Sequence, residues 1–232
     1  MSFWTLACEP CKLSGPEIAC SDHCLNASGL STAQLVTTLS ISPDITEHIA
    51  QLNAALGVPS NYAASRGLTL CLTPEALVDT EADYYGRPQR LTAQALRAWS
   101  QMKSCAAESE ITLHLISAYR SPDYQYELLK RKLDAGQSLE QILQVNAAPG
   151  YSEHHTGRAV DVGTPGCAAL VEEFEQTPAF AWLREHAREF GFALSYPRDN
   201  PAGMAYEPWH WCFQEQSSGA FAKNLDKPAR KE

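Results

Sequence analysis

The apolar segments of this chain are short, and this brevity constrains the fold more than any other feature. In the second half of the chain they cover residues 111–118, 157–162, 192–196 and 209–213, each long enough for one strand. Segments with helical spacing lie between them. Short strands interspersed with helices predict an α+β domain, in which helices pack against small sheets.

The strongest helical pattern covers residues 91–107, where Leu91, Ala95 and Trp99 recur on one face. Thr92 is a candidate N-cap, because its side chain can accept a hydrogen bond from a free backbone N–H of the first turn. Further helices are predicted at residues 44–56, 121–134, 139–145 and 178–190.

The chain divides into three parts by composition. Residues 1–84 are rich in turn-forming Pro, Ser, Asn and Gly, and they predict an irregular N-terminal extension with one short helix. The regular patterns fill residues 85–216, which we expect to form the folded domain. Residues 217–232 predict a solvated, basic C-terminal tail.

Four of the eight cysteines lie close together near the N-terminus, at Cys8, Cys11, Cys20 and Cys24. The two spacings resemble paired zinc knuckles, although the gap between the pairs is short. His23 could join such a site. Two disulfides or plain reduced thiols are the alternatives, and the sequence does not decide among the three.

Composition excludes several classes of protein. Hydrophobic residues make up 44% of the 232 residues, enough for one sizeable core, so wholesale disorder is excluded. The net charge of −9 would repel phosphate backbones, and nucleic acid is therefore not an expected partner. No apolar stretch approaches the roughly 20 residues of a transmembrane helix. The N-terminus lacks the pattern of a signal peptide, which favours the cytoplasm unless an export segment has already been removed.

Three motifs place metal-ligand and catalytic residue types on or beside predicted strands. His154, Asp161 and His210 could supply the three N and O ligands of a catalytic zinc, which leaves a position open for water. Glu207 lies three residues before His210, where a carboxylate could serve as general base. Arg120 follows another strand, and its forked guanidinium could hold a carboxylate or an oxyanion.

Taken singly, these patterns are common in unrelated proteins, and their joint presence is what gives them weight. No nucleophile elbow, phosphate-binding loop or dinucleotide fingerprint competes with them. A Cys–His peptidase built on Cys167 or Cys212 stays open as an alternative, but it would leave Asp161 and Glu207 without a role.

The same three motifs carry a specific resemblance. The runs SAYRSPDYQ (117–125), GYSEHHTGRAVDV (150–162) and YEPWHW (206–211) resemble the VanY-type D-alanyl-D-alanine carboxypeptidases in order and approximate spacing. These enzymes belong to a zinc peptidase group that shares its fold with lysostaphin-type enzymes and the hedgehog domain. The resemblance spans about residues 85–213 and implies a small antiparallel sheet with helices packed against it.

The resemblance implies a zinc-dependent carboxypeptidase that hydrolyses the C-terminal amide bond of peptidoglycan stem peptides. It matches the zinc ligands to His154, Asp161 and His210, the catalytic base to Glu207 and the substrate-contacting arginine to Arg120.

The resemblance also matches Ser152 and Gln125 to positions that line the substrate site. Tyr119 and Trp209 flank the motif residues, and for each a substrate contact and simple packing both remain open. The sequence departs from the family pattern at His155, where Gln is common, and at Cys212, where a basic residue is common.

Two rival functions remain at this stage. The same chemistry could act on a different bond, as in an L,D-carboxypeptidase or an endopeptidase that cuts within the stem peptide. A non-catalytic, zinc-containing peptidoglycan-binding module is the rival from another class. The presence of Glu207 favours an enzyme, since a binding module has no need of a base.

Overall fold

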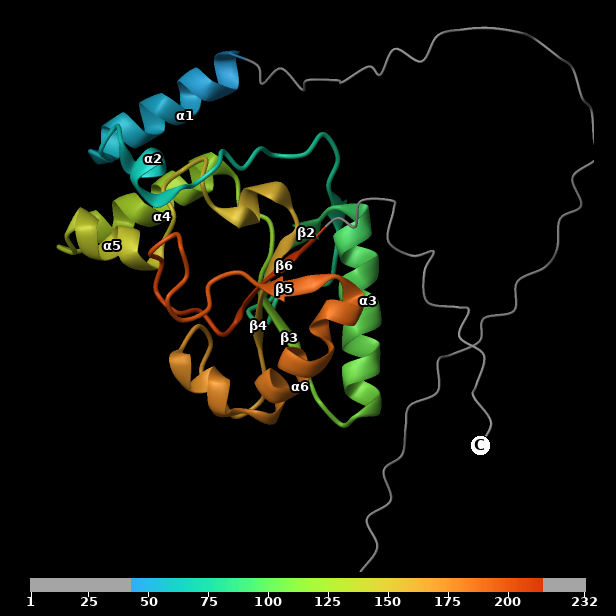
Figure 1. Cartoon of the computed structure of the whole chain (residues 1–232). Helices are drawn as coiled ribbons and strands as arrows, with labels where there is room; N and C mark the ends of the chain where they lie inside the picture. Colours follow the sequence, from blue (N-terminus) through green and yellow to red (C-terminus); the bar gives the residue numbers. More distant parts are fainter. Residues whose placement is uncertain (1–42, 215–232) are drawn as a thin grey trace, which may run out of the picture. The chain divides into compact units, whose positions relative to one another are not determined.

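We describe residues 43–214 of the chain from a computed structural model (Figure 1). The N-terminal cysteine cluster, His23 and the basic tail all lie outside the described residues, so the expectations about them remain open. In the described part, no helix is both long and apolar enough to cross a membrane.

The elements follow one another in the order expected of an α+β domain. The α-helices are α1 (Pro43–Leu56), α2 (Tyr62–Arg66), α3 (Ala93–Glu108), α4 (Pro122–Asp134), α5 (Leu139–Val145) and α6 (Pro178–His186). The strands are β1 (Val78–Asp79), β2 (Arg90–Leu91), β3 (His114–Ser117), β4 (Ala159–Gly163), β5 (Phe192–Leu194) and β6 (His210–Phe213). The 3-10 segments are η1 (Glu153–Thr156), η2 (Glu172–Gln176) and η3 (Ala187–Phe190).

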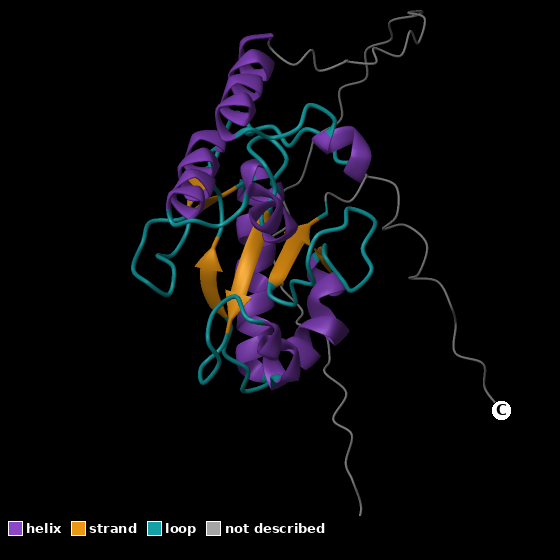
Figure 2. Cartoon of the chain, turned by 90° about the vertical axis from the view of Figure 1, so that its left-hand side faces the viewer, coloured by secondary structure: helices purple, strands orange, loops and turns teal. Residues whose placement is uncertain are grey.

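Four of these strands form one antiparallel sheet in the order β3-β4-β6-β5. Figure 2 shows its strands side by side in the middle of the described part, with helices packed around them. The remaining two strands, β1 and β2, form a separate antiparallel pair. Mixed helices with small antiparallel sheets are the α+β fold that the sequence predicts.

Helix α3 forms where its apolar spacing and its cap predict. The Thr92 hydroxyl accepts a hydrogen bond from the backbone N–H of Ala95 at 3.3 Å. Trp99 and Met102 are fully buried on the face turned to the core. The predicted start at Leu91 is two residues early, because Leu91 ends strand β2 and buries its side chain from there.

The main core lies between the four-stranded sheet and helices α3 and α6, which flank it in Figure 1. Alternate residues of β4 and β6 supply it with apolar side chains, among them Val160, Val162 and Trp211. The other residues of β4, including Asp161, point to the opposite face of the sheet. One face of the central strands therefore stabilises the domain, and the other is free for polar side chains.

The segment before the predicted domain contributes to a second apolar cluster. Leu56 at the end of α1 and Tyr62 in α2 pack against Leu129 of α4 and against Ile142 and Leu143 of α5. Residues 43–84 thus contain two helices that pack against α4 and α5, and the short strand β1, which pairs with β2.

Some predicted elements are shorter in the structure than in the sequence pattern. The strand expected at residues 111–118 covers only β3, and the helix expected at 178–190 changes into the 3-10 segment η3 after His186. Apolar side chains continue beyond the hydrogen-bonded ladder or the regular helix in both cases, so periodicity overestimates their length.

Candidate active site

The candidate site is built on the two central strands of the sheet. Asp161 on β4 and His210 on β6 are direct partners in the antiparallel register. Residues opposite one another on neighbouring strands point to the same face, so their side chains meet. The His210 Nδ1 and Asp161 Oδ1 atoms lie 3.0 Å apart, and both residues are buried.

His154 reaches the same place from the 3-10 segment η1, just before β4. Gly157 ends this segment with a φ of 62°, a left-handed conformation that favours glycine, and the chain then turns into the strand. The His154 Nδ1–H group donates to the carbonyl oxygen of Ala118 at 2.5 Å. This bond fixes the tautomer and leaves the Nε2 lone pair directed at the site.

These three side chains could hold one metal ion. One ligand atom from each of His154, Asp161 and His210 lies within 4.8 Å of the others. The His154 Nε2 atom is buried and makes no hydrogen bond among the described residues, although Asp161 Oδ2 is 3.2 Å away. A buried lone pair without a hydrogen, beside a carboxylate and a second imidazole, fits a divalent cation.

The surrounding protein groups shift the pKa values of the three side chains in different directions. Burial, and then the charge of Arg120, lower the pKa of His154 to about 4. Burial opposes the charge of Asp161, but His154 and His210 outweigh it and lower the pKa of its carboxyl. Burial likewise opposes protonation of His210, yet hydrogen bonds to Asp161 and Glu153 raise its pKa to about 10. Since metal ligation requires a neutral imidazole, binding a cation would displace this proton.

Glu207 lies beside the cluster on the segment that leads into β6. Its Oε2 atom is 3.9 Å from His210 Nδ1, and its backbone N–H donates to Tyr196 O at 3.1 Å. Burial, the largest influence, raises the pKa of Glu207 to about 7. A carboxylate with a pKa near neutrality can both accept and return a proton.

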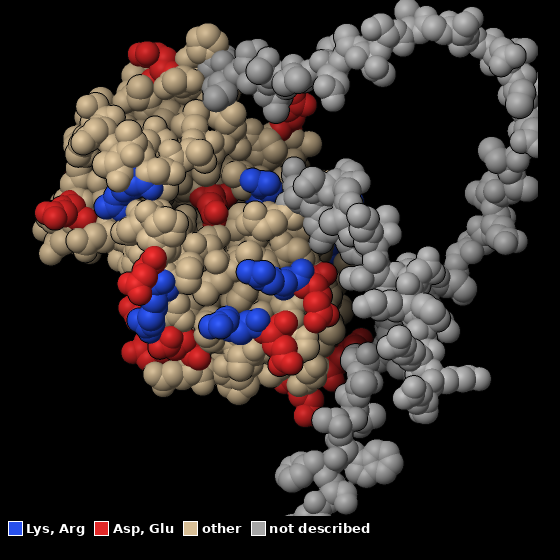
Figure 3. Space-filling model, in the orientation of Figure 1, with Lys and Arg blue, Asp and Glu red and all other residues tan. Residues whose placement is uncertain are grey.

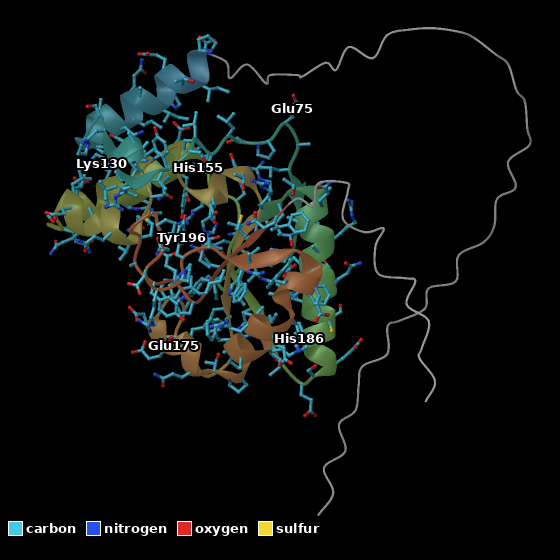
Figure 4. All side chains as sticks on the ribbon, in the orientation of Figure 1. Glu75, Lys130, His155, Glu175, His186 and Tyr196 are labelled. Atoms are coloured by element: carbon cyan, nitrogen blue, oxygen red, sulfur yellow. The ribbon has the colours of Figure 1, made fainter. Side chains whose placement is uncertain are left out.

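Arg120 lies in the loop between β3 and α4 and lines the same pocket. Its backbone N–H donates to His154 O at 3.3 Å, and its Nε atom is buried without a hydrogen-bond partner in the described chain. His155, which lies in the interior in Figure 4, tethers this residue: its Nδ1 donates to Arg120 O at 2.7 Å. The His155 Nε2 atom accepts from Gly150 N–H at 3.1 Å, so both ring nitrogens are satisfied.

One cavity of about 330 Å³ is lined by His154, Asp161, His210, Glu207 and Arg120, but not by His155. Of the residues expected to bind substrate, Ser152, Gln125 and Trp209 line this cavity. Gln125 is buried, and its Nε2 donates to Ala147 O at 2.8 Å while its Oε1 has no partner in the described part. Tyr119 does not line it and contributes to a neighbouring cavity instead.

Sequence analysis did not single out several residues that complete the pocket. Lys132 and Asn146 line its rim and hydrogen-bond each other, from Nζ to Oδ1 at 3.1 Å. Tyr196, labelled in Figure 4, places its ring 4.9 Å from that of His210. None of the three lies in a ligand-type motif, so the sequence offers no local signal for them. Cys212, where the sequence departs from the family pattern, is buried on β6.

A small antiparallel sheet that presents two imidazoles and a carboxylate to a pocket, beside a further carboxylate, is an arrangement that could hold a metal ion and support hydrolysis. The family model described as VanY, D-alanyl-D-alanine carboxypeptidase, matches residues 88–216 of the 232. The chain belongs to this family.

Curated relatives and solved structures agree with this assignment. A putative carboxypeptidase, YodJ of Bacillus subtilis, is 27% identical over 70% of this chain and 58% of its own length. A D-alanyl-D-alanine carboxypeptidase of Enterococcus faecium is 31% identical over 52% of this chain and 36% of its own. The structure of the LdcB LD-carboxypeptidase is 28% identical with a TM-score of 0.55, over 61% of this chain and 69% of that one. The match thus spans little more than half of the first relative and about a third of the second.

Proposed function

We propose that the chain is a zinc-dependent D-alanyl-D-alanine carboxypeptidase that hydrolyses the C-terminal amide bond of peptidoglycan stem peptides. The observation that carries the proposal is the position of Glu207 beside the buried His154, Asp161 and His210, in a pocket that also contains Arg120. A binding module has no use for a buried carboxylate with a pKa near 7 at this place.

His154, Asp161 and His210 would hold the zinc through two nitrogens and one carboxylate oxygen. A zinc bound by such a set supplies a Lewis acid that polarises a carbonyl and makes water a nucleophile at neutral pH. Glu207 takes a proton from the attacking water and returns it to the amine of the departing residue. The C–N bond of the amide breaks, and the products are a shortened peptide and a free amino acid.

Arg120 lines the same pocket as Glu207 and the three candidate metal ligands. Its buried Nε–H has no partner within the described residues, so a bound carbonyl, oxyanion or carboxylate would satisfy it. His155 holds the Arg120 backbone, and Arg120 N–H is in turn bonded to His154 O. The arginine and the metal ligands are therefore positioned by one connected network.

A second candidate is an L,D-carboxypeptidase, which releases the terminal residue of a tetrapeptide. The observation that favours it is the similarity to the LdcB LD-carboxypeptidase, at 28% identity and a TM-score of 0.55. The catalytic groups are the same in both proposals, and only the stereochemistry at the scissile bond differs.

Mass spectrometry of the products separates these functions. The zinc-loaded protein is incubated with a stem pentapeptide ending in D-Ala-D-Ala and, separately, with the tetrapeptide ending in one D-Ala. The main proposal predicts loss of a single alanine from the pentapeptide and none from the tetrapeptide. Cleavage of the tetrapeptide alone would establish the L,D-carboxypeptidase, and internal cleavage products would establish an endopeptidase.

A further inference from the structure

A second cavity of about 550 Å³ adjoins the metal pocket. The residues that line both cavities form the junction between them, and they are Arg120, Lys132, Asn146, Asp161 and Leu170. Beyond this junction, the second cavity is bounded by Arg90 of β2 and by Tyr119 at the end of β3. The two cavities therefore make one continuous route along the protein surface.

Two of the cations that line this route, Arg90 and Lys132, make no ion pair with a carboxylate of residues 43–214. The Arg90 guanidinium lies over the Tyr119 ring, 5.0 Å from its centroid, and no carboxylate of residues 43–214 pairs with it. Lys132 has only the Asn146 amide oxygen as a side-chain partner in that range. The single carboxylate that lines the second cavity is Asp161, which belongs to the candidate metal site.

Some other cations of the described surface do have acidic partners. The face shown in Figure 3 has basic side chains lying beside acidic ones, and Arg198, for example, pairs with Glu175 at 2.8 Å. Arg87, which also lines the second cavity, is neutralised by the buried Asp83 at 2.6 Å. Arg90 thus differs from Arg87 in the same cavity, because an aromatic ring and not a carboxylate holds its guanidinium in place.

The surroundings of Lys132 disfavour the charged form of its amine, and a nearby anion would stabilise that form. Burial, and then the charge of Arg120, lower the pKa of its amine and outweigh the opposing charge of Glu207. A carboxylate placed near the junction would therefore gain from two cations, and an additional ammonium group would be repelled by both.

We infer that the second cavity is a subsite for a carboxylate on the acyl side of the peptide, with Arg90 as the residue that determines the preference. This inference rests on the proposed carboxypeptidase function. Because a carboxypeptidase releases one terminal residue, only the acyl side of its substrate is long enough to extend from the metal pocket into another cavity. Arg90 would then favour stem peptides whose third residue is diaminopimelate, which carries a side-chain carboxylate, over those with lysine.

Three pentapeptides that differ only in the third residue test this inference: diaminopimelate, its side-chain carboxamide, and lysine. The carboxamide keeps the shape of diaminopimelate and removes the negative charge. We expect the zinc-loaded protein to cleave the diaminopimelate peptide with a kcat/KM about tenfold above that of the other two, the usual size of one charge-assisted hydrogen bond. Arg90→Gln should lower only the diaminopimelate value, to the level of the carboxamide.

The matched control is Arg97→Gln, which removes an exposed arginine of α3 that lines neither cavity. It should leave all three values unchanged. Equal cleavage of the three peptides by the unmodified protein, or an equal loss for all three in Arg90→Gln, would overturn the inference while leaving the proposed function intact.

If none of the peptides is cleaved, the proposed function fails, and binding still decides the inference. Calorimetric titration of the same three peptides should then show about tenfold tighter binding of the diaminopimelate peptide, lost in Arg90→Gln. Equal affinities would overturn it.

Discussion

The Glu153 carboxylate accepts a hydrogen bond from the outer nitrogen of His210, with Oε2 2.9 Å from Nε2. The opposite ring nitrogen, Nδ1, faces Asp161 at 3.0 Å. Because the carboxylate can only accept, it keeps the proton on Nε2 and leaves Nδ1 free to act as a ligand. Carboxylate–histidine pairs of this kind orient metal ligands and raise their basicity.

Glu153→Ala should therefore weaken zinc binding by about 10- to 100-fold, as the loss of such a partner usually does. Glu153→Gln should restore part of the affinity, because its amide oxygen still accepts from Nε2–H. The zinc dissociation constant, measured by chelator competition, checks both. Equal affinity of Glu153→Ala and the unmodified protein would show that the pair does not support the site.

His155 is predicted to position the Arg120 backbone through its two ring nitrogens. His155→Ala should lower the free energy of unfolding by about 2 kcal/mol, because it leaves buried groups of Gly150 and Arg120 unpaired. His155→Gln should be milder, since an amide offers one donor and one acceptor. Chemical denaturation measures the difference, and a His155→Ala variant as stable as His155→Gln would contradict this role.

Asp83 should make stability depend on pH in the acid range. Burial opposes its ionisation, but hydrogen bonds from Arg87 and from the backbone N–H of Tyr85 outweigh this and lower the pKa of the carboxyl. A lowered pKa stabilises the fold above the unfolded-state value of about 3.9, and this stabilisation is lost as the pH falls through the folded-state pKa.

The test compares urea unfolding of the unmodified protein and Asp83→Asn between pH 7 and pH 3. The difference in unfolding free energy between them should be largest at neutral pH and shrink as the pH falls. A difference that stays constant, or that grows on acidification, would contradict the assignment.

Gly157→Ala should destabilise the fold and disturb the candidate site. The φ of 62° is strained for any residue with a Cβ, and that Cβ would collide with Leu77 Cδ2. The left-handed conformation costs about 1–2 kcal/mol. Gly136→Ala is the control, because it has a φ of 88° with no neighbour within 4 Å.

Both variants should lose stability, but only Gly157→Ala should also weaken zinc binding, since this turn joins His154 to β4. Equal zinc affinity of the two variants would show that the turn at Gly157 does not support the zinc site.

Local sequence signals predicted much of this fold. Apolar spacing and the Thr92 cap marked α3, and the apolar segment at residues 157–162 marked the strand that became β4. Strand β2 was not predicted, because two residues carry no usable periodicity. Its position is set by pairing with strand β1, and the two residues of β1 lie outside the local sequence pattern around Leu91.

The residues of the candidate site were likewise predictable only in part from the sequence. His154, Asp161, His210 and Glu207 were identified as a set because their types and motif spacings fit one chemistry, and the structure brings them together. Lys132 enters the pocket through the position of α4, which packs against α1 and α5, and its sequence surroundings resemble an ordinary charged helix face. Residues that serve a site through packing alone give no local signal.

The most direct test of the central claim is a joint measurement of zinc content and turnover in Glu207→Gln. The account predicts the same number of zinc ions per chain as in the unmodified protein, and release of the C-terminal amino acid from stem peptides reduced at least 100-fold. His154→Ala should instead lose one zinc per chain, whatever the N-terminal cysteines bind. Full turnover by Glu207→Gln, or unchanged zinc content in His154→Ala, would contradict the account.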